Sequence, residues 1–225
     1  YTRKSTAPVT DADGSVYASA VTRATNSALL NRLSVVTSGV QSQQAILDGL
    51  TRLQETIGDT TDTTSPAAQL GALTSALQAL ANAPSNTSLA QAVVTAAQGL
   101  AGSLNSATAT VTSVRSQADA DIATSVSKVN DLLSQFQQLN TQIMRGTSMG
   151  EDVTDAMDDR DAVITQLSEQ MGITVVYRDN NDIALYTDSG VTLFDKSARS
   201  VTFQASQTLT PGTTGNAVYV DGVPV

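Results

Sequence analysis

The chain has 225 residues and contains neither Cys nor His. This inventory excludes disulfides, thiolate metal sites, His-dependent catalysis and nearly all zinc and haem sites. A formal charge of -9 disfavours binding to nucleic acid or to an anionic membrane surface, and no apolar run approaches the roughly 20 residues that a membrane span needs. With 4% aromatic residues and no Trp, the core must be built from Ala, Leu, Val and Ile, which suits packed helices.

The N-terminal part is predicted to be a short connector followed by a long helix. Residues 1–14 form the expected extended connector, which ends in the turn-forming run Asp11–Gly14. From about Ser15 to Ile57 apolar residues lie three and four positions apart, which predicts an amphipathic helix capped by Gly58. The chain starts without Met, so we expect a fragment of a longer protein.

A second, shorter helix is expected after a polar loop. Residues 59–64 are almost all Asp and Thr, which compete for their own backbone and form poor helix. Ser65 then offers an N-cap and Pro66 suits the first helical position. Leucines three and four positions apart continue this helix until Pro84 ends it.

The longest periodic segment is predicted to be one helix from about Leu89 to Arg145. Ser88 and Gln91 form a capping-box pattern at its start, and Gly146 is the expected stop. At about 1.5 Å per residue such a helix would span about 85 Å, far more than a compact domain needs. The positions expected to face inward are Val93, Ala96, Leu100, Leu104, Ala107, Val111, Val114, Ala118, Ile122, Ser125, Val129, Leu132, Phe136, Leu139 and Ile143.

A fourth helix and then strands are predicted for the C-terminal part. The helix is expected near Asp155 to Met171, with Gly172 as its cap. Beyond it the apolar period changes to two, which indicates a hairpin of residues 173–177 and 183–187 around a polar turn. Further short strands are expected at residues 191–194, 201–203 and 218–220.

Acidic residues gather at the start of the fourth helix, at Glu151, Asp152, Asp155, Asp158, Asp159 and Asp161. They could form a cation site or an acid/base pair, but helix capping and favourable interaction with the helix dipole explain them better. Arg160 could be a buried ion-pair hub or a surface residue, and the sequence slightly favours the surface.

No residue is assigned a catalytic, cofactor-binding or metal-binding role. The Asp11–Gly14 run resembles the start of a calcium loop but lacks the later acidic ligands. Gly99 and Gly102 match no nucleotide-binding pattern, and we expect them to allow close approach of helices. An enzyme acting through an Asp pair and a bound cation is a remote alternative.

Two segments together resemble the flagellar hook-associated protein 1 family, the hook-filament junction proteins of bacteria. The segment from Leu77 to Gly99 resembles the family's helix, Pro break and following helix. The segment that starts at Asp155 resembles the family's Asp-x-Arg-Asp, Leu-Ser and Gly-Ile stretch that leads into a hairpin. The residues that match this second pattern are Asp158, Arg160, Asp161, Leu167, Ser168, Gly172 and Ile173.

The resemblance implies a structural adaptor that joins hook to filament in the extracellular flagellum, after export through the flagellar type III channel. The implied partners are hook protein, hook-associated protein 3 and copies of the same chain, with no cofactor. The family's terminal segments, which drive polymerisation, are missing here, so we expect this fragment to be monomeric. Another flagellar axial protein, of flagellin or hook-associated protein 3 type, and an unrelated oligomeric coiled-coil signalling or secretion protein remain alternatives.

The predicted fold is mainly α. It is an elongated bundle of long helices with a β-hairpin, followed by the start of a β-rich domain. In chain order, we expect the extended connector at 1–14, the elongated helical bundle with its hairpin at 15–205, and the truncated β-rich domain at 206–225.

Overall fold

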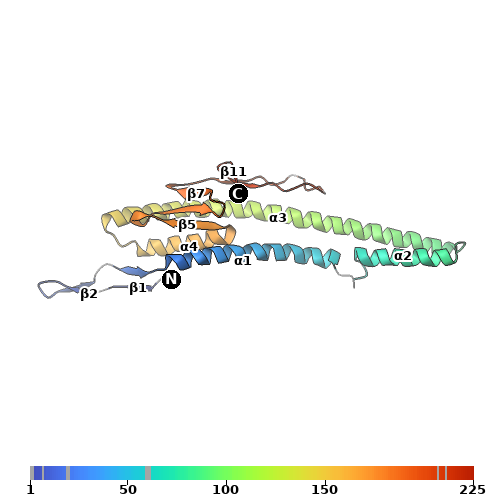
Figure 1. Ribbon diagram of the computed structural model, residues 1–225, viewed down its shortest axis with the longest axis horizontal. Coiled ribbons are helices and arrows are strands. Elements are labelled where there is room, and N and C mark those ends of the chain that lie inside the picture. Colours follow the sequence, from blue (N-terminus) through green and yellow to red (C-terminus); the bar gives the residue numbers. More distant parts are fainter. Residues whose placement is uncertain (1–2, 7, 19–20, 59–61, 207, 211) are drawn as a thin grey trace. The chain divides into compact units, whose positions relative to one another are not determined.

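The computed structural model describes the whole chain except residues 1–2, 7, 19–20, 59–61, 207 and 211. The described residues form two compact units. Unit 1 comprises Tyr1–Gln43, Ile122–Ala205 and Asn216–Val225, and unit 2 comprises Gln44–Asp121 and Ser206–Gly215. Helices dominate, strands gather toward the C-terminus, and the predicted fold class is confirmed in these respects (Figure 1).

Unit 1 contains the hydrophobic core, which lies where helices pack against a sheet. The C-terminal part of α3 (Thr87–Met149) and helix α4 (Thr154–Gln170) contribute Leu133, Phe136 and Leu167, each fully buried. The ring of Phe136 meets that of Phe194 edge-on, with centroids 4.9 Å apart and planes at 75°. The sheet is antiparallel, in the order β5-β6-β7-β8, and its strands are β5 (Ile173–Tyr177), β6 (Ile183–Thr187), β7 (Thr192–Asp195) and β8 (Ser197–Ala198).

The predicted hairpin is β5 and β6. Ile173 pairs with Thr187, and Tyr177 pairs with Ile183. A 3-10 turn at Asp179–Asn181 (η2) joins the strands, and its two Asn residues adopt the left-handed conformation with φ of 58°, which Asn tolerates better than most residues. The later strands are also found. The one predicted at 191–194 is β7 of the same sheet, and those at 201–203 and 218–220 belong to a second antiparallel sheet of order β11-β10-β9, formed by β9 (Val201–Phe203), β10 (Val218–Val220) and β11 (Val223–Pro224).

The predicted start of the first long helix is wrong. Helix α1 runs from Ser27 to Leu53 and continues as a short π-helix, η1 (Gln54–Gly58). It begins there because the side-chain oxygen of Asn26 accepts a hydrogen bond from the backbone N–H of Leu29, as an N-cap does. The preceding residues are extended, in β1 (Arg3–Ser5), β2 (Pro8–Thr10), β3 (Val16–Ala18) and β4 (Thr22–Ala24).

These four strands form an N-terminal arm, which comprises the described residues of 3–24 and is made of two antiparallel pairs. β1 pairs with β4, and β2 pairs with β3 around the predicted turn. Within that turn the backbone N–H of Gly14 donates to the carbonyl of Asp11, and Gly14 has φ of 85°. The described side chains of the arm contribute no residue to the hydrophobic core of unit 1.

The N-cap of α2 is as predicted, whereas that of α3 is not. Helix α2 (Pro66–Asn82) begins after Ser65, whose hydroxyl accepts from the backbone N–H of Ala68 at 3.2 Å. Helix α3 starts one residue before the expected cap Ser88, because Asn86 accepts from the N–H groups of Ser88 and Leu89. The expected polar loop spans residues 59–64, of which 59–61 lie outside the described residues.

The end of α3 also differs from the prediction. The helix passes through Gly146 and ends before Gly150, which has φ of 73°. Gly146 instead permits a close approach, because a Cβ there would lie 2.5 Å from Cγ1 of Val153. Gly172 likewise is no cap: the C-cap of α4 is Met171, and a Cβ on Gly172 would collide with the carboxylate of Asp188.

Within unit 2, one of the two predicted close glycine contacts occurs. A Cβ on Gly99 of α3 would lie 2.4 Å from the side-chain oxygen of Gln69 in α2. The expectation for Gly102 is wrong, because nothing lies within 4 Å of the corresponding position. The loop 206–215 is held to α3 by Asp119, which accepts from the N–H and hydroxyl of Ser206, and by Arg115, which donates to the carbonyls of Thr210 and Thr213.

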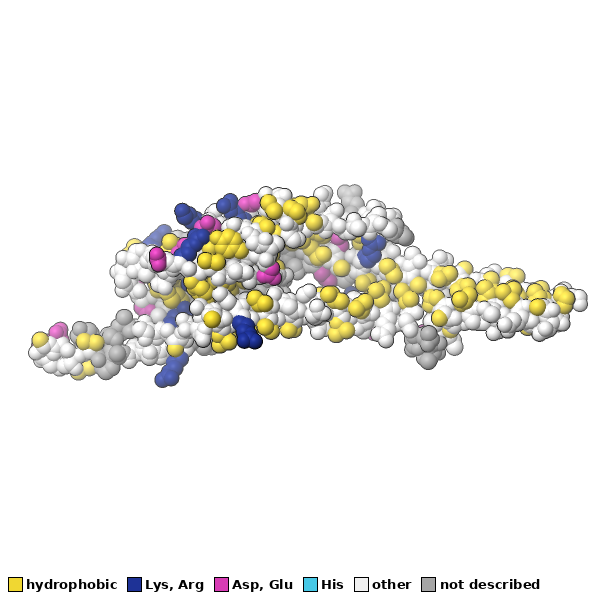
Figure 2. Space-filling model, viewed as in Figure 1, with side chains coloured by type: hydrophobic (Ala, Val, Ile, Leu, Met, Phe, Trp, Pro, Cys, Tyr) yellow, Lys and Arg dark blue, Asp and Glu magenta, His cyan; other side chains and the backbone are white. Residues whose placement is uncertain are grey.

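The apolar stripe of α3 runs along one uninterrupted helix, but its burial changes along the way. Val129, Phe136 and Ile143 are at most 3% exposed, whereas Leu104 is 50% and Val111 37% exposed. Figure 2 shows hydrophobic side chains gathered on the visible face over α2 and the first part of α3. Large side chains of unit 2 that are exposed include Ile46, Leu47, Leu50, Leu70, Leu77, Val94, Leu104 and Val111. No helix among the described residues is long and apolar enough to cross a membrane.

Candidate functional site: the polar contacts of helix α4

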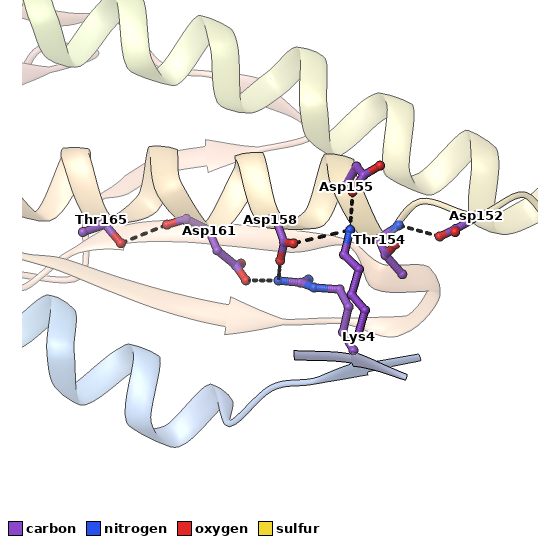
Figure 3. A network of polar contacts seen from close by, with 8 residues as sticks. Lys4, Asp152, Thr154, Asp155, Asp158, Asp161 and Thr165 are labelled. Atoms are coloured by element: carbon purple, nitrogen blue, oxygen red, sulfur yellow. Dashed lines mark hydrogen bonds and ion pairs between the residues drawn. The ribbon is translucent and has the colours of Figure 1, made fainter. Parts of the chain in front are cut away.

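One face of α4 carries the acidic residues of the Asp-x-Arg-Asp segment, and it faces the N-terminal arm (Figure 3). Arg23 of β4 places Nη2 2.7 Å from Oδ1 of Asp158 and 2.6 Å from Oδ2 of Asp161. Lys4 of β1 forms ion pairs with Asp155 and Asp158, the latter at 3.6 Å. The three carboxylates are three residues apart along α4, so they line one side of the helix.

These ion pairs differ in how far water reaches them. The Arg23 side chain is 8% exposed and that of Asp161 16%, whereas Asp155 is 95% exposed. The hydrogen bond to Asp155 raises the pKa of Lys4, but both groups are open to solvent, so this pair contributes little to stability. Arg23 is therefore the stronger of the two attachments.

Asp152 has the capping role that the sequence suggested for the acidic group. Val153 occupies the N-cap position of α4 and has no capping side chain. Asp152 accepts a hydrogen bond from the backbone N–H of Thr154 at 3.0 Å, which lowers the pKa of its carboxyl. The cap thus comes from one residue further upstream than usual.

The expectation of a surface position for Arg160 is wrong. Its residue is 4% exposed, and its guanidinium contacts α3 and the hairpin turn, whereas Asp158 and Asp161 contact the arm. Nη1 donates to Oδ1 of Asn140 on α3 and to the carbonyl of Asn181 in the hairpin turn, both at 2.6 Å. Burial lowers the pKa of Arg160 to about 10, so the guanidinium is still charged at neutral pH.

Arg160 is also not the hub of an ion pair, because both acceptors are neutral. Asn140 in turn donates to Oδ1 of Asp182 at 2.7 Å, so α3, α4 and the hairpin turn share one polar network. Nε of Arg160 is buried and has no partner among the described residues. The network therefore fixes the positions of three elements at the cost of one unpaired donor.

The remaining residues of the predicted family motif lie at the junction of α4 and the hairpin. Leu167 and Ile173 belong to the hydrophobic core, at 0% and 1% exposed. Ser168 is fully buried, and its hydroxyl donates to the carbonyl of Thr165 at 2.6 Å. Gly172 leaves room for the side chain of Asp188 beside β5, the first strand of the hairpin. Each of these residues serves packing or chain direction in the structure.

A second cationic contact, which sequence reasoning missed, joins the strands. Arg178 follows β5 and donates from Nη1 to Oδ1 of Asp195 at the end of β7, at 2.6 Å. This hydrogen bond lowers the pKa of Asp195 and raises that of Arg178. The sequence carried only a weak signal for this contact, because the two residues are 17 positions apart and lie next to or within strands whose register the sequence does not fix.

Within the described part of the chain, no group of three or more acidic residues has the geometry to hold a metal ion. The carboxylates of Asp155, Asp158 and Asp161 are engaged with Lys4 and Arg23, so they join parts of the fold. The fold and its polar contacts define a mainly α-helical structural domain, whose charged groups fasten its own elements together.

The comparisons with known proteins agree with this class. Residues 50–222 match the model for the flagellar hook-associated protein FlgK helical domain. The chain therefore belongs to this family. It is 31% identical over 135 residues to flagellar hook-associated protein 1 of Bacillus subtilis, an alignment that covers 59% of this chain and 27% of the relative. Over 209 residues it is 23% identical to the Escherichia coli protein of the same name, covering 92% of this chain and 38% of that one.

A solved structure shares the fold. The flagellar hook junction protein FlgK from Burkholderia pseudomallei superposes with a TM-score of 0.72 at 23% identity, over 85% of this chain and 33% of that chain. The aligned part of the chain spans between about a quarter and two-fifths of the length of the curated relatives named above.

Proposed function

We propose that this chain is the helical part of a structural adaptor that joins hook to filament in the bacterial flagellum. The observation that carries the proposal is the family match over residues 50–222, together with relatives named flagellar hook-associated protein 1. The absence of Cys and His from the sequence agrees with a structural role and with the proposal that the chain is not an enzyme.

The proposed partners are hook protein on one side, hook-associated protein 3 on the other, and copies of the same chain. The exposed apolar residues of α1, α2 and α3 in unit 2 support contacts with other subunits, because a row of half-exposed Leu and Val gains stability when a partner covers it. We infer that the protein works outside the cell, in the flagellum, after type III export.

We also propose the division predicted from the sequence, with the connector at 1–14, the helical bundle at 15–205 and the start of a β-rich domain at 206–225. Proteolysis would test it, because an exposed domain boundary is cut before the domains themselves. Cleavage concentrated near 14 and 205 supports this division, and early cleavage within the helices contradicts it.

The location of the protein tests the proposed function directly. Antibodies against the 225-residue chain, applied to isolated flagella and viewed by immunogold electron microscopy, are expected to label a single band at the hook-filament boundary. Label along the whole filament would favour a flagellin-type protein. Label confined to the cell body would contradict a flagellar role and favour a signalling or secretion coiled coil.

Analytical ultracentrifugation separates the adaptor from an autonomous coiled coil. The 225-residue chain is expected to sediment as a monomer of 23.2 kDa. A stable symmetric oligomer at micromolar concentration would contradict this expectation, because an adaptor domain needs its neighbours in the flagellum for assembly, whereas a coiled coil assembles by itself.

A further inference from the structure

We propose that the N-terminal arm, residues 3–24, is a strap held on α4 by ion pairs, and that it detaches as a unit while the core of unit 1 stays folded. The proposal rests on the ion pairs that Lys4 and Arg23 make with Asp155, Asp158 and Asp161 (Figure 3). It goes beyond the adaptor function, because it concerns how one segment of the domain is attached.

The register of the β1–β4 pair places two positive charges opposite each other. Lys4 and Arg23 are direct cross-strand partners in the β1–β4 pair. Two like charges placed opposite each other destabilise a strand pair. The carboxylates of α4 offset this repulsion while they face both cations, which couples formation of β1–β4 to docking on the helix.

The described side chains of the arm do not take part in the hydrophobic core. The described side chains of β1 are exposed, as are Val9 and Val16 further out on the arm. Val21 is half-buried, and the core of unit 1 includes no described residue of the arm. A two-stranded hairpin in water is at best marginally stable by itself. The contacts described between the arm and α4 are ion pairs, and salt weakens the exposed pair of Lys4 with Asp155 more than the shielded pairs of Arg23.

A short connection joins the arm to α1. After β4 ends at Ala24, only Thr25 and Asn26 precede α1, and both lack regular secondary structure. The capping hydrogen bond, which the backbone N–H of Leu29 donates to Oδ1 of Asn26, belongs to the helix and does not depend on the arm. The arm can therefore leave α4 without disturbing α1.

Hydrogen exchange of the 225-residue chain, followed by mass spectrometry, tests the strap. The wild-type protein is compared at 0.05 and 0.5 M NaCl. Arg23→Gln is compared with a control variant, Arg3→Gln, which removes the same charge from the same strand pair. Arg3 forms none of the ion pairs with α4 that the structure describes. Losing the charge-assisted bonds of Arg23 is expected to speed exchange in residues 3–24 by about tenfold. Higher salt is expected to act in the same direction, and residues 173–187 are expected to be unchanged.

A double variant sharpens the test. Asp158→Asn with Asp161→Asn leaves the two cross-strand cations facing each other, so the arm should exchange faster than in Arg23→Gln. The proposal would be overturned if the exchange rate of the arm were the same at both salt concentrations. It would also be overturned if the arm and residues 173–187 of the sheet both exchanged faster. The salt comparison uses the wild-type protein, so it decides the matter even where a variant fails to fold.

Discussion

The two halves of α3 carry the same apolar stripe in different surroundings. In unit 1, α4 and the sheet cover the stripe, and Val129 and Phe136 are at most 3% exposed. In unit 2 the stripe continues along the same helix, but Leu104 remains half exposed. The period of three and four residues therefore predicts the helix and its apolar side in both halves. What covers that side depends on segments far away in the sequence.

The comparison predicts a large difference between two leucines on the same helix. Leu132→Ala removes a buried side chain, 5% exposed, and is expected to lower the free energy of unfolding by about 3 kcal/mol. Leu104→Ala, on a side chain that is 50% exposed, should cost less than about 1 kcal/mol. Urea denaturation followed by circular dichroism measures both. Equal losses would mean that the two halves of the stripe are covered alike.

The polar network of unit 1 gives the next largest effect. Asn140→Ala removes the acceptor of Arg160 and the donor to Asp182, and is expected to cost about 2 kcal/mol because a buried charge loses a partner. Asn105→Ala, an exposed position on the same helix, is the matched control and should change stability by less than about 0.5 kcal/mol. Thermal melts of the two variants that agree within error would show that the network adds nothing to stability.

Two glycines of α3 should respond in opposite directions. Gly102→Ala meets open space and is expected to raise stability by about 0.5 to 1 kcal/mol through helix propensity. Gly146→Ala should lower stability, because its Cβ would lie 2.5 Å from Val153 and the connection to α4 must shift. Chemical denaturation compares the two, and a stabilising Gly146→Ala would show that this connection yields easily.

The smallest expected effect is a dependence on acidic pH. The pKa of Asp195 is lowered by its hydrogen bond to Arg178, so the folded state binds the proton more weakly than the unfolded state. This contribution is fully present above the ordinary Asp value of 3.8 and is lost as pH falls through the lower, folded value. Asp195→Asn should therefore flatten the stability profile below about pH 4 and leave its slope near pH 7 unchanged. An unaltered acid limb would exclude a role for this pair.

Local signals predicted much of the fold. The spacing of apolar residues indicated α3, and the alternation after Gly172 indicated β5 and β6. The starts of α1 and α3 were missed, although Asn26 and Asn86 are ordinary capping residues, because other candidates with a similar pattern stood nearby.

The site was harder to predict because its partners are distant in the chain. Arg23 and Asp161 are 138 residues apart, and no periodic pattern connects an extended arm to the fourth helix. Arg160 was expected on the surface because its neighbours in sequence are acidic, but in a helix adjacent residues point to different sides. Its burial depends on Asn140 and Asn181, which only the folded chain brings within reach.

We propose that neighbouring subunits in the flagellum cover the exposed part of the α3 stripe. Since these 225 residues contain no Cys, Leu104→Cys and Ser106→Cys each introduce a single thiol into this part of the protein, on the stripe and roughly opposite to it. Both are expected to react equally fast with a maleimide in the isolated chain. In assembled flagella Leu104→Cys should react at least about tenfold more slowly than Ser106→Cys, because a packed interface excludes the reagent. Equal rates in assembled flagella would contradict the account.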